Sequence, residues 1–166
     1  MAIPVLPQVP DKHLKIIGQI AAVWSRTEYA IQRLVVELAT DDLSGGMFLT
    51  QNLGYQSRID LLRVYASGFK ELNPDQVRAW NKMLDNLTAA YGQRSKFVHG
   101  LWCEPNTAGE PTLMIFRVKS KLDLRKEAVP LSALSKTLDN ILEAEAELIR
   151  VAKDYVDVDL KGPGLP

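Results

Sequence analysis

The sequence predicts an all-α (mostly) protein: an up-and-down four-helix bundle with a small β-hairpin inserted before the last helix. Two observations carry this prediction. Apolar residues recur at steps of three and four along four stretches of the chain, which is the spacing of one buried helix face. Between the third and the fourth of these stretches, the pattern changes to short apolar runs around a turn, which is typical of a hairpin.

The first helix is expected to start at Asp11, a suitable N-cap, and to end in the glycine-containing segment 40–46. Residues 1–10 precede it as an extended lead-in, because they contain three prolines. They have no basic start and are not read as a secretion signal. The inner face of this helix is predicted to carry Ile17, Ala21, Trp24, Glu28, Ile31, Val35 and Leu38.

The second helix is expected from about Tyr55 to Leu72, after a short helical turn in 47–53. Asn73 and Pro74 then signal a new helix, with asparagine as N-cap and proline at the first helical position. The predicted inner faces carry Ile59, Leu62, Ala66 and Phe69 in the second helix, and Val77, Trp80, Leu84, Leu87, Tyr91, Arg94 and Val98 in the third.

The remaining elements complete one domain. Leu101–Cys103 and Thr112–Val118 read as the two strands of a hairpin at about 101–119. The fourth helix follows Pro130, with Ser132 as its cap. A chain of 166 residues fits a single domain, expected at 11–160 and followed by a tail at 161–166.

Composition excludes several classes of protein. The 20 basic and 20 acidic residues give a formal net charge of zero, so no overall field attracts nucleic acid or an anionic membrane. The single cysteine, Cys103, forms no disulfide within the chain and favours a reducing compartment. No apolar run approaches the roughly 18 residues of a membrane span. A cytoplasmic protein without a membrane contact is expected.

The zero total conceals an uneven distribution of charge. Residues 91–126 contain seven basic and three acidic residues, whereas 139–159 contain seven acidic and two basic ones. On a strand, the alternating Arg117, Lys119 and Lys121 would share one face. With Lys96 they form a candidate RNA-binding ribbon, or alternatively a charged edge that prevents aggregation. The acidic run 143–147 is expected to be an exposed helix face.

Common catalytic and metal-binding motifs are absent from the sequence. It contains no phosphate-binding loop of the P-loop type, no nucleophile elbow, no H-E-x-x-H and no paired C-x-x-C. Its two histidines, His13 and His99, are far apart in the chain. We therefore expect no metal site and no cofactor.

Two charges interrupt the predicted apolar faces, Glu28 on the first helix and Arg94 on the third. A core-facing charge loses hydration unless another group compensates it. Three kinds of compensation are possible: the two residues pair with each other, they bind a ligand, or they contact a second subunit. In an up-and-down bundle they would be offset by about 9 Å along the helices, so their pairing is not assured. Charge beside Trp24 and Trp80 also indicates a subunit interface, and hence a homodimer.

Arg94 and His99 form the candidate catalytic pair. A histidine can take a proton from a ribose 2′-hydroxyl or return one to a leaving oxygen, and a guanidinium can hold a phosphate. Five positions apart on an ideal helix, the side chains diverge by about 140°. Gly100 should end the helix at His99 and let the imidazole turn toward Arg94. The alternative is a histidine that only interacts with the helix dipole.

The stretch Arg94-Ser-Lys-Phe-Val-His-Gly-Leu-Trp102 resembles the R-x(4–6)-H motif of the HEPN superfamily of helical bundles. This resemblance implies a metal-independent endoribonuclease of toxin or phage-defence type, with two Arg94–His99 pairs meeting in a homodimer. It also implies a cognate antitoxin or another protein partner. Ser95 stands where the family usually has Asn, Asp or His, and with Glu28 it is a supporting residue. The alternative is a non-catalytic interaction or nucleotide/RNA-binding module with Arg94 in a structural ion pair.

Overall fold

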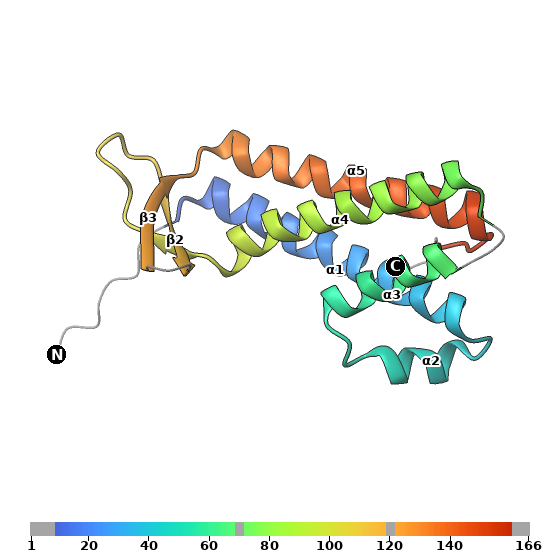
Figure 1. Ribbon diagram of the computed structural model, residues 1–166. Coiled ribbons are helices and arrows are strands. Elements are labelled where there is room, and N and C mark those ends of the chain that lie inside the picture. Colours follow the sequence, from blue (N-terminus) through green and yellow to red (C-terminus); the bar gives the residue numbers. More distant parts are fainter. Residues whose placement is uncertain (1–8, 69–71, 119–121, 161–166) are drawn as a thin grey trace.

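The structure, a computed structural model, describes residues 9–68, 72–118 and 122–160. Most of the predicted lead-in, the predicted tail at 161–166 and Phe69 lie outside the described residues. The described part is mostly α-helical with a small antiparallel sheet, which confirms the predicted class (Figure 1). Its helices are α1 (Asp11–Ala39), α2 (Leu43–Thr50), α3 (Tyr55–Gly68), α4 (Pro74–His99) and α5 (Leu131–Val156).

Local signals explain the start of α4 but not the starts of α1 and α5. Asn73 caps α4, because its side-chain oxygen accepts hydrogen bonds from the backbone N–H groups of Asp75 and Gln76, while the Gln76 side chain accepts one from Asn73 N–H. The caps expected for two other helices are wrong. Prolines occupy the N-cap positions of α1 and α5, so Asp11 lies inside its helix and Ser132 lies in the first turn.

The up-and-down order of four helices is not what the structure shows. The eight-residue α2 returns antiparallel along the end of α1, with the Gln32 amide donating to the carbonyl of Met47. Consequently α3 runs parallel to α1. Trp24 packs against Tyr55 near the start of α3, and further along both helices Val35 and Leu61 line the same groove. Helix α4 runs the opposite way to α1, α3 and α5 (Figure 1).

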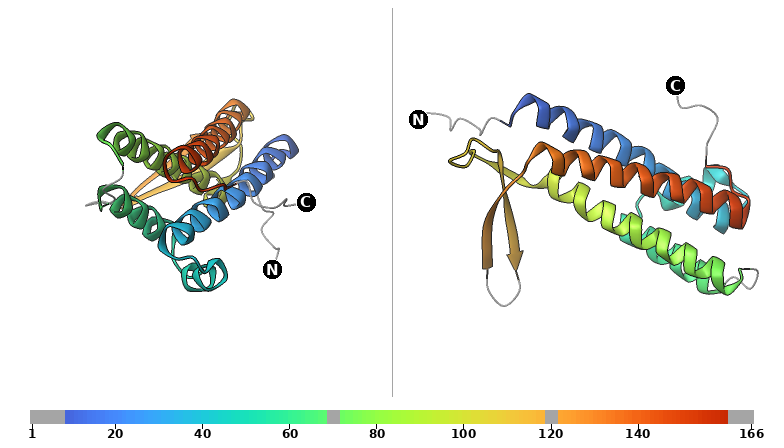
Figure 2. Two further views of the ribbon diagram at one scale, coloured as in Figure 1. Left: turned by 90° about the vertical axis from the view of Figure 1, so that its right-hand side faces the viewer. Right: turned by 90° about the horizontal axis from the view of Figure 1, so that it is seen from above.

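The sheet contains one strand more than predicted. Strands β1 (Leu101–Cys103), β2 (Thr112–Val118) and β3 (Leu122–Ala128) pair antiparallel in the order β1-β2-β3. Residues 122–128 therefore extend the predicted hairpin by a third strand. The sheet lies at the end of the molecule where α4 ends and α5 begins, and the β2–β3 hairpin projects sideways from the helices (Figure 2).

The apolar faces of the long helices meet in one core. Trp24 and Trp80 are fully buried within the single chain, so neither ring is available to a second subunit, and the homodimer stays a prediction. The Trp80 indole N–H donates to the Leu62 carbonyl at 3.0 Å. Trp24 also packs against Tyr55 and Tyr91, whose rings stack with centroids 4.2 Å apart. The core thus joins α1, α3 and α4 through aromatic rings.

The acidic run 143–147 is not exposed along its whole length. Glu145 is buried and accepts two hydrogen bonds from Arg26, one of them from Nε to Oε1 at 2.7 Å. These bonds, together with the carboxylate charge, raise the pKa of the Arg26 guanidinium above its ordinary value. The pair connects α1 to α5, so a charge that the sequence places on the surface is part of the helix packing.

Within the described ranges, none of the helices combines the length and the apolar character that a membrane crossing needs. The same part of the chain holds no group of three or more His, Cys, Asp or Glu side chains arranged to bind a metal ion. His13 is buried, and its Nε2–H donates to the Val129 carbonyl at 3.0 Å. It connects the start of α1 to the segment before α5.

Candidate functional site

The end of α4 is shaped by close packing at Gly100. Helix α4 ends at His99, as expected, and Gly100 continues in an extended conformation with φ −70° and ψ 152°. A Cβ at this position would lie 2.3 Å from the Lys96 carbonyl oxygen and 2.7 Å from Leu113 Cδ1. Glycine is therefore required by lack of space, not by a left-handed backbone.

The next turn is held by Trp102. Its indole N–H donates to the Phe97 carbonyl at 3.1 Å, which satisfies one of the carbonyls left without a partner at the end of a helix. The Trp102 ring also makes an edge contact with buried His13, with ring centroids 6.4 Å apart. The backbone that carries His99 is thus attached to the sheet and, through His13, to α1.

The structure brings Arg94 and His99 together. Arg94 Nη1 lies 2.6 Å from His99 Nε2. A guanidinium can only donate, so Nε2 of the imidazole accepts this hydrogen bond and the ring proton is on Nδ1. The expected turn of the imidazole toward the arginine is therefore present, and it leaves Nε2 in the unprotonated form that a general base needs.

The two side chains differ in their exposure. His99 is exposed, whereas Arg94 is half-buried and its Nε has no hydrogen-bond partner among the described residues. Partial burial restricts the rotamers of the arginine, so it loses less conformational freedom on binding an anion than a fully exposed one. Its terminal nitrogens lie beside an imidazole that solvent reaches.

His99 also borders an open groove of about 380 Å³ between α4 and the sheet. Ser95 and Lys96 line it from α4, and Leu101, Met114 and Ile115 line it from the strands. The groove therefore has a polar wall, which includes His99, and an apolar wall. The strand residues of this groove could not be identified from the sequence, because only the folded chain places the sheet beside α4.

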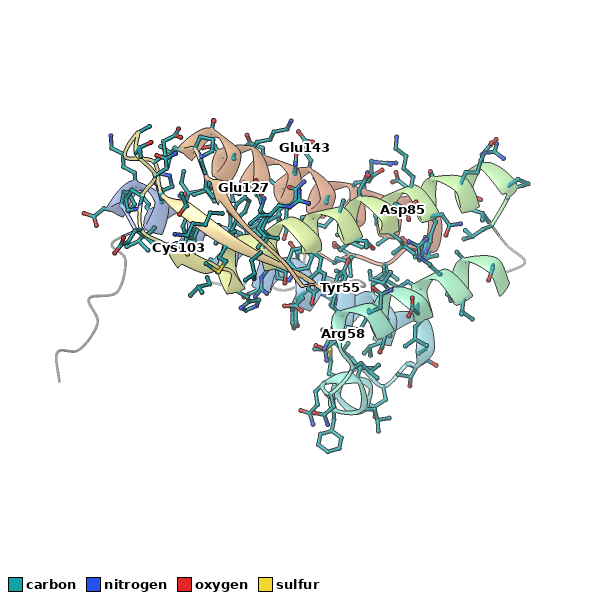
Figure 3. All side chains as sticks on the ribbon, turned by 60° about the vertical axis from the view of Figure 1, so that its left-hand side comes forward. Tyr55, Arg58, Asp85, Cys103, Glu127 and Glu143 are labelled. Carbon is teal, nitrogen blue, oxygen red and sulfur yellow. The ribbon has the colours of Figure 1, made fainter. Side chains whose placement is uncertain are left out.

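Lys96 is not the free cation that an RNA-binding role would use. Its ammonium group lies 2.7 Å from Glu127 Oε1, and it also lies over the Phe97 ring at 5.3 Å. Glu127 reaches it from β3, the strand that the sequence analysis missed (Figure 3). Both side chains are partly exposed, so this ion pair is screened and can open.

Glu28 does not meet Arg94. Trp24 of α1 packs against Tyr91 of α4, with ring centroids 5.7 Å apart. From that contact, Glu28 lies four residues toward one end of the molecule and Arg94 three residues toward the other. The separation along the helix axes is therefore about 10 Å. Within the part of the chain that the structure describes, Glu28 has neither a hydrogen bond nor an ion pair.

A buried tyrosine lies close to Glu28. Burial raises the pKa of the Tyr55 hydroxyl to about 12, and the nearby Glu28 charge acts in the same direction. The neighbouring Thr88 hydroxyl acts in the opposite direction and lowers this pKa, although no hydrogen bond of normal geometry joins the Tyr55 hydroxyl to any described residue. Tyr55 and Arg58 lie at the start of α3 (Figure 3). The sequence pattern did not predict that either of these polar side chains would be buried.

The predicted basic ribbon falls largely outside the described residues. Arg117 lies on β2 opposite Asp123 of β3 in the strand register, and its side chain is not described. Lys119 and Lys121 lie between the two strands, outside the described residues. The ribbon stays a prediction from the sequence.

Comparison with protein-family models, with curated proteins and with solved structures finds no match for this chain. The resemblance to the HEPN superfamily therefore depends on residues 94–102 and on the helical architecture. The geometry around Arg94 and His99 is the remaining indication of function.

Proposed function

We propose that the protein is a HEPN-like, metal-independent endoribonuclease in which Arg94 and His99 carry the reaction. The observation that supports this most strongly is the 2.6 Å contact between Arg94 Nη1 and His99 Nε2 at an exposed helix end. It puts a half-buried cation beside the unprotonated nitrogen of an exposed imidazole. This is the pairing that cleavage by a neighbouring 2′-hydroxyl requires.

The reaction proceeds in one displacement at phosphorus. The substrate phosphate takes over the Arg94 donors, which frees His99 Nε2 to accept the proton of the 2′-hydroxyl. The 2′-oxygen then bonds to phosphorus as the bond to the 5′-oxygen breaks, and the leaving oxygen takes a proton from water or from His99 of a second subunit. The products are a 2′,3′-cyclic phosphate and a 5′-hydroxyl. Arg94 stabilises the negative charge that builds up on the phosphate oxygens.

A non-catalytic binding module is the second candidate, and one observation favours it. Lys96, the cation nearest to His99 in sequence, is neutralised by Glu127. In that function, Arg94 and His99 form a structural contact at the helix end, and the adjoining groove binds a nucleotide or a protein partner. Ser95 lines that groove in either case.

The experiment is single-turnover cleavage of single-stranded RNA in EDTA by the wild type and three variants. His99→Ala and Arg94→Ala should each lower the rate by about 10²–10⁴-fold. Arg78→Ala is the matched control, because Arg78 is an exposed arginine on the same helix that pairs with Asp75 far from the site. It should cleave at the wild-type rate. Wild-type protein that binds RNA or nucleotides without cutting would favour the binding module, and His99→Ala protein that still cuts would exclude His99.

A further inference from the structure

The groove beside His99 is lined by two kinds of side chain. On its apolar wall, Leu101 of β1 and Met114 of β2 are opposite each other in the strand register, and Ile115 follows. On its polar wall, the half-buried Ser95 side chain has no hydrogen-bond partner among the described residues. A serine hydroxyl can both donate and accept a hydrogen bond. The groove thus offers an apolar surface and a free polar group to the same occupant.

The groove contains little free charge. Apart from His99, Lys96 is the one ionisable side chain among the described residues that line it, and its ammonium group is 2.7 Å from Glu127 Oε1. Arg94 is outside the groove, and within the described part of the chain it makes a hydrogen bond to His99 but no ion pair. An anion is therefore attracted to Arg94, whereas the groove suits a neutral group.

His99 borders both of these regions. Its Nε2 is 2.6 Å from Arg94 Nη1, and His99 also lines the groove. A ribonucleotide presents its groups in the same order: a phosphate, the 2′-hydroxyl next to it, and a neutral base on the same ribose. When the phosphate is at Arg94 and the hydroxyl at His99, the base of that nucleotide is the group that reaches the groove.

We propose that this groove binds the base of the nucleotide whose 2′-hydroxyl gives up its proton, with Met114 and Ile115 against the face of the base and the Ser95 hydroxyl at its edge. The inference rests on the proposed function and defines its substrate as RNA with an unpaired base at the cleavage position. A base within a duplex is stacked and paired, so it cannot enter the groove. The groove volume of about 380 Å³ is at the lower end of the range for small-ligand sites, which suits one base with its ribose.

A glycine keeps the α4 side of the groove open. Gly92 lines the groove from within α4, and a Cβ at this position would meet no atom within 4 Å. A leucine here would fill part of the groove without a clash inside the protein, and leucine forms helices better than glycine. Gly18 is the matched position, because it is also an exposed glycine inside a helix, with no atom within 4 Å of its Cβ, and it does not line the groove.

The first test measures binding without cleavage. The probe is single-stranded 2′-fluoro RNA, which has no 2′-hydroxyl, and it is compared with a chain of the same length and charge that lacks bases. The wild type should bind the probe with bases at least about tenfold more tightly. Gly92→Leu should lose most of this difference, and Gly18→Leu should keep it. Equal affinity of the wild type for both chains, including no detectable binding of either, or a difference that Gly92→Leu keeps, would overturn the inference.

The second test removes part of the apolar wall instead of filling the groove. Met114→Ala should weaken binding of the probe with bases by about tenfold, the order of effect that a lost apolar contact has in a binding pocket. Met47→Ala is the matched control, because Met47 is also half-buried but lies on α2 and does not line the groove. It should bind the probe as the wild type does, and equal losses for the two variants would contradict a base site at Met114.

Cleavage assays separate this inference from the proposed function. If the wild type cuts RNA, and Gly92→Leu and Met114→Ala cut it with unchanged kcat/KM, the base site is overturned and the proposed function remains. If the wild type cuts no RNA but shows base-dependent binding that both variants lose, the proposed function fails and the groove is a base-binding site without cleavage.

Discussion

Replacing Arg26 by alanine should destabilise the protein more than its exposure alone indicates. The Arg26 side chain is 54% exposed, but its partner Glu145 is 7% exposed, so the substitution leaves a buried carboxylate without a counter-charge. Removing one partner of a fully buried pair costs about 3–5 kcal/mol. Solvent reaches the arginine end here and screens the pair, so we expect a loss of about 2 kcal/mol in the free energy of unfolding.

Arg150→Ala is the matched control for this prediction. The Arg150 side chain is also 54% exposed, but it pairs with Asp154, which is 51% exposed. Its replacement should cost no more than about 0.5 kcal/mol. Adding Glu145→Gln to Arg26→Ala should restore part of the stability, because the neutral amide removes the stranded charge while keeping its shape. Urea melts measure all four proteins. Equal losses for Arg26→Ala and Arg150→Ala, or no recovery with Glu145→Gln, would refute the reasoning.

Three further predictions concern the core and the helix end. Gly100→Ala should lower the free energy of unfolding, measured by a urea melt, by about 1–3 kcal/mol, because the new methyl group would clash with the Lys96 carbonyl oxygen. Unchanged stability would mean that the backbone at the end of α4 moves to accommodate the methyl group. Tyr55→Phe should be neutral or stabilising at pH 7, since the buried hydroxyl has no partner among the described residues. As the pH rises from 10 to about 12, the free energy of unfolding of the wild type should fall by up to about 2.7 kcal/mol, because Tyr55 ionises at a lower pH in the unfolded chain than in the folded protein, where its pKa is about 12. Tyr55→Phe should not show this decrease. Glu28→Gln and Arg94→Gln should be additive in urea melts, because the two residues do not meet, and a coupling energy of more than about 0.5 kcal/mol would contradict their separation.

Sequence periodicity predicts the long helices because their buried faces repeat along a continuous segment. The boundary at Asn73 and Pro74 is set by residues that bond within one turn. The contact between Arg94 and His99 is also local, because the two residues are five positions apart and their distance depends mainly on how one helix ends. Interactions of this range are visible in the sequence, and the structure brings them together as expected.

The features that were missed depend on residues far apart in the chain. Glu145 alternates with alanines and reads as part of a solvated face, but its burial depends on Arg26, 119 positions away. Strand β3 has four charged residues among its seven, as is common for an edge strand paired on one side. Helix α2 buries a glycine and no large apolar residue, so no apolar period marks the segment that makes α3 parallel to α1.

The most direct test of the proposed function is the chemical nature of the RNA ends. Fragments made by the wild type in EDTA should end in a 2′,3′-cyclic phosphate and begin with a 5′-hydroxyl, because His99 takes its proton from the neighbouring 2′-hydroxyl. His99→Ala should yield none of these fragments while keeping the circular dichroism spectrum of the wild type, since His99 is exposed at the end of α4. Fragments with a 3′-hydroxyl and a 5′-phosphate, or cyclic ends produced equally by His99→Ala, would contradict the roles assigned to Arg94 and His99.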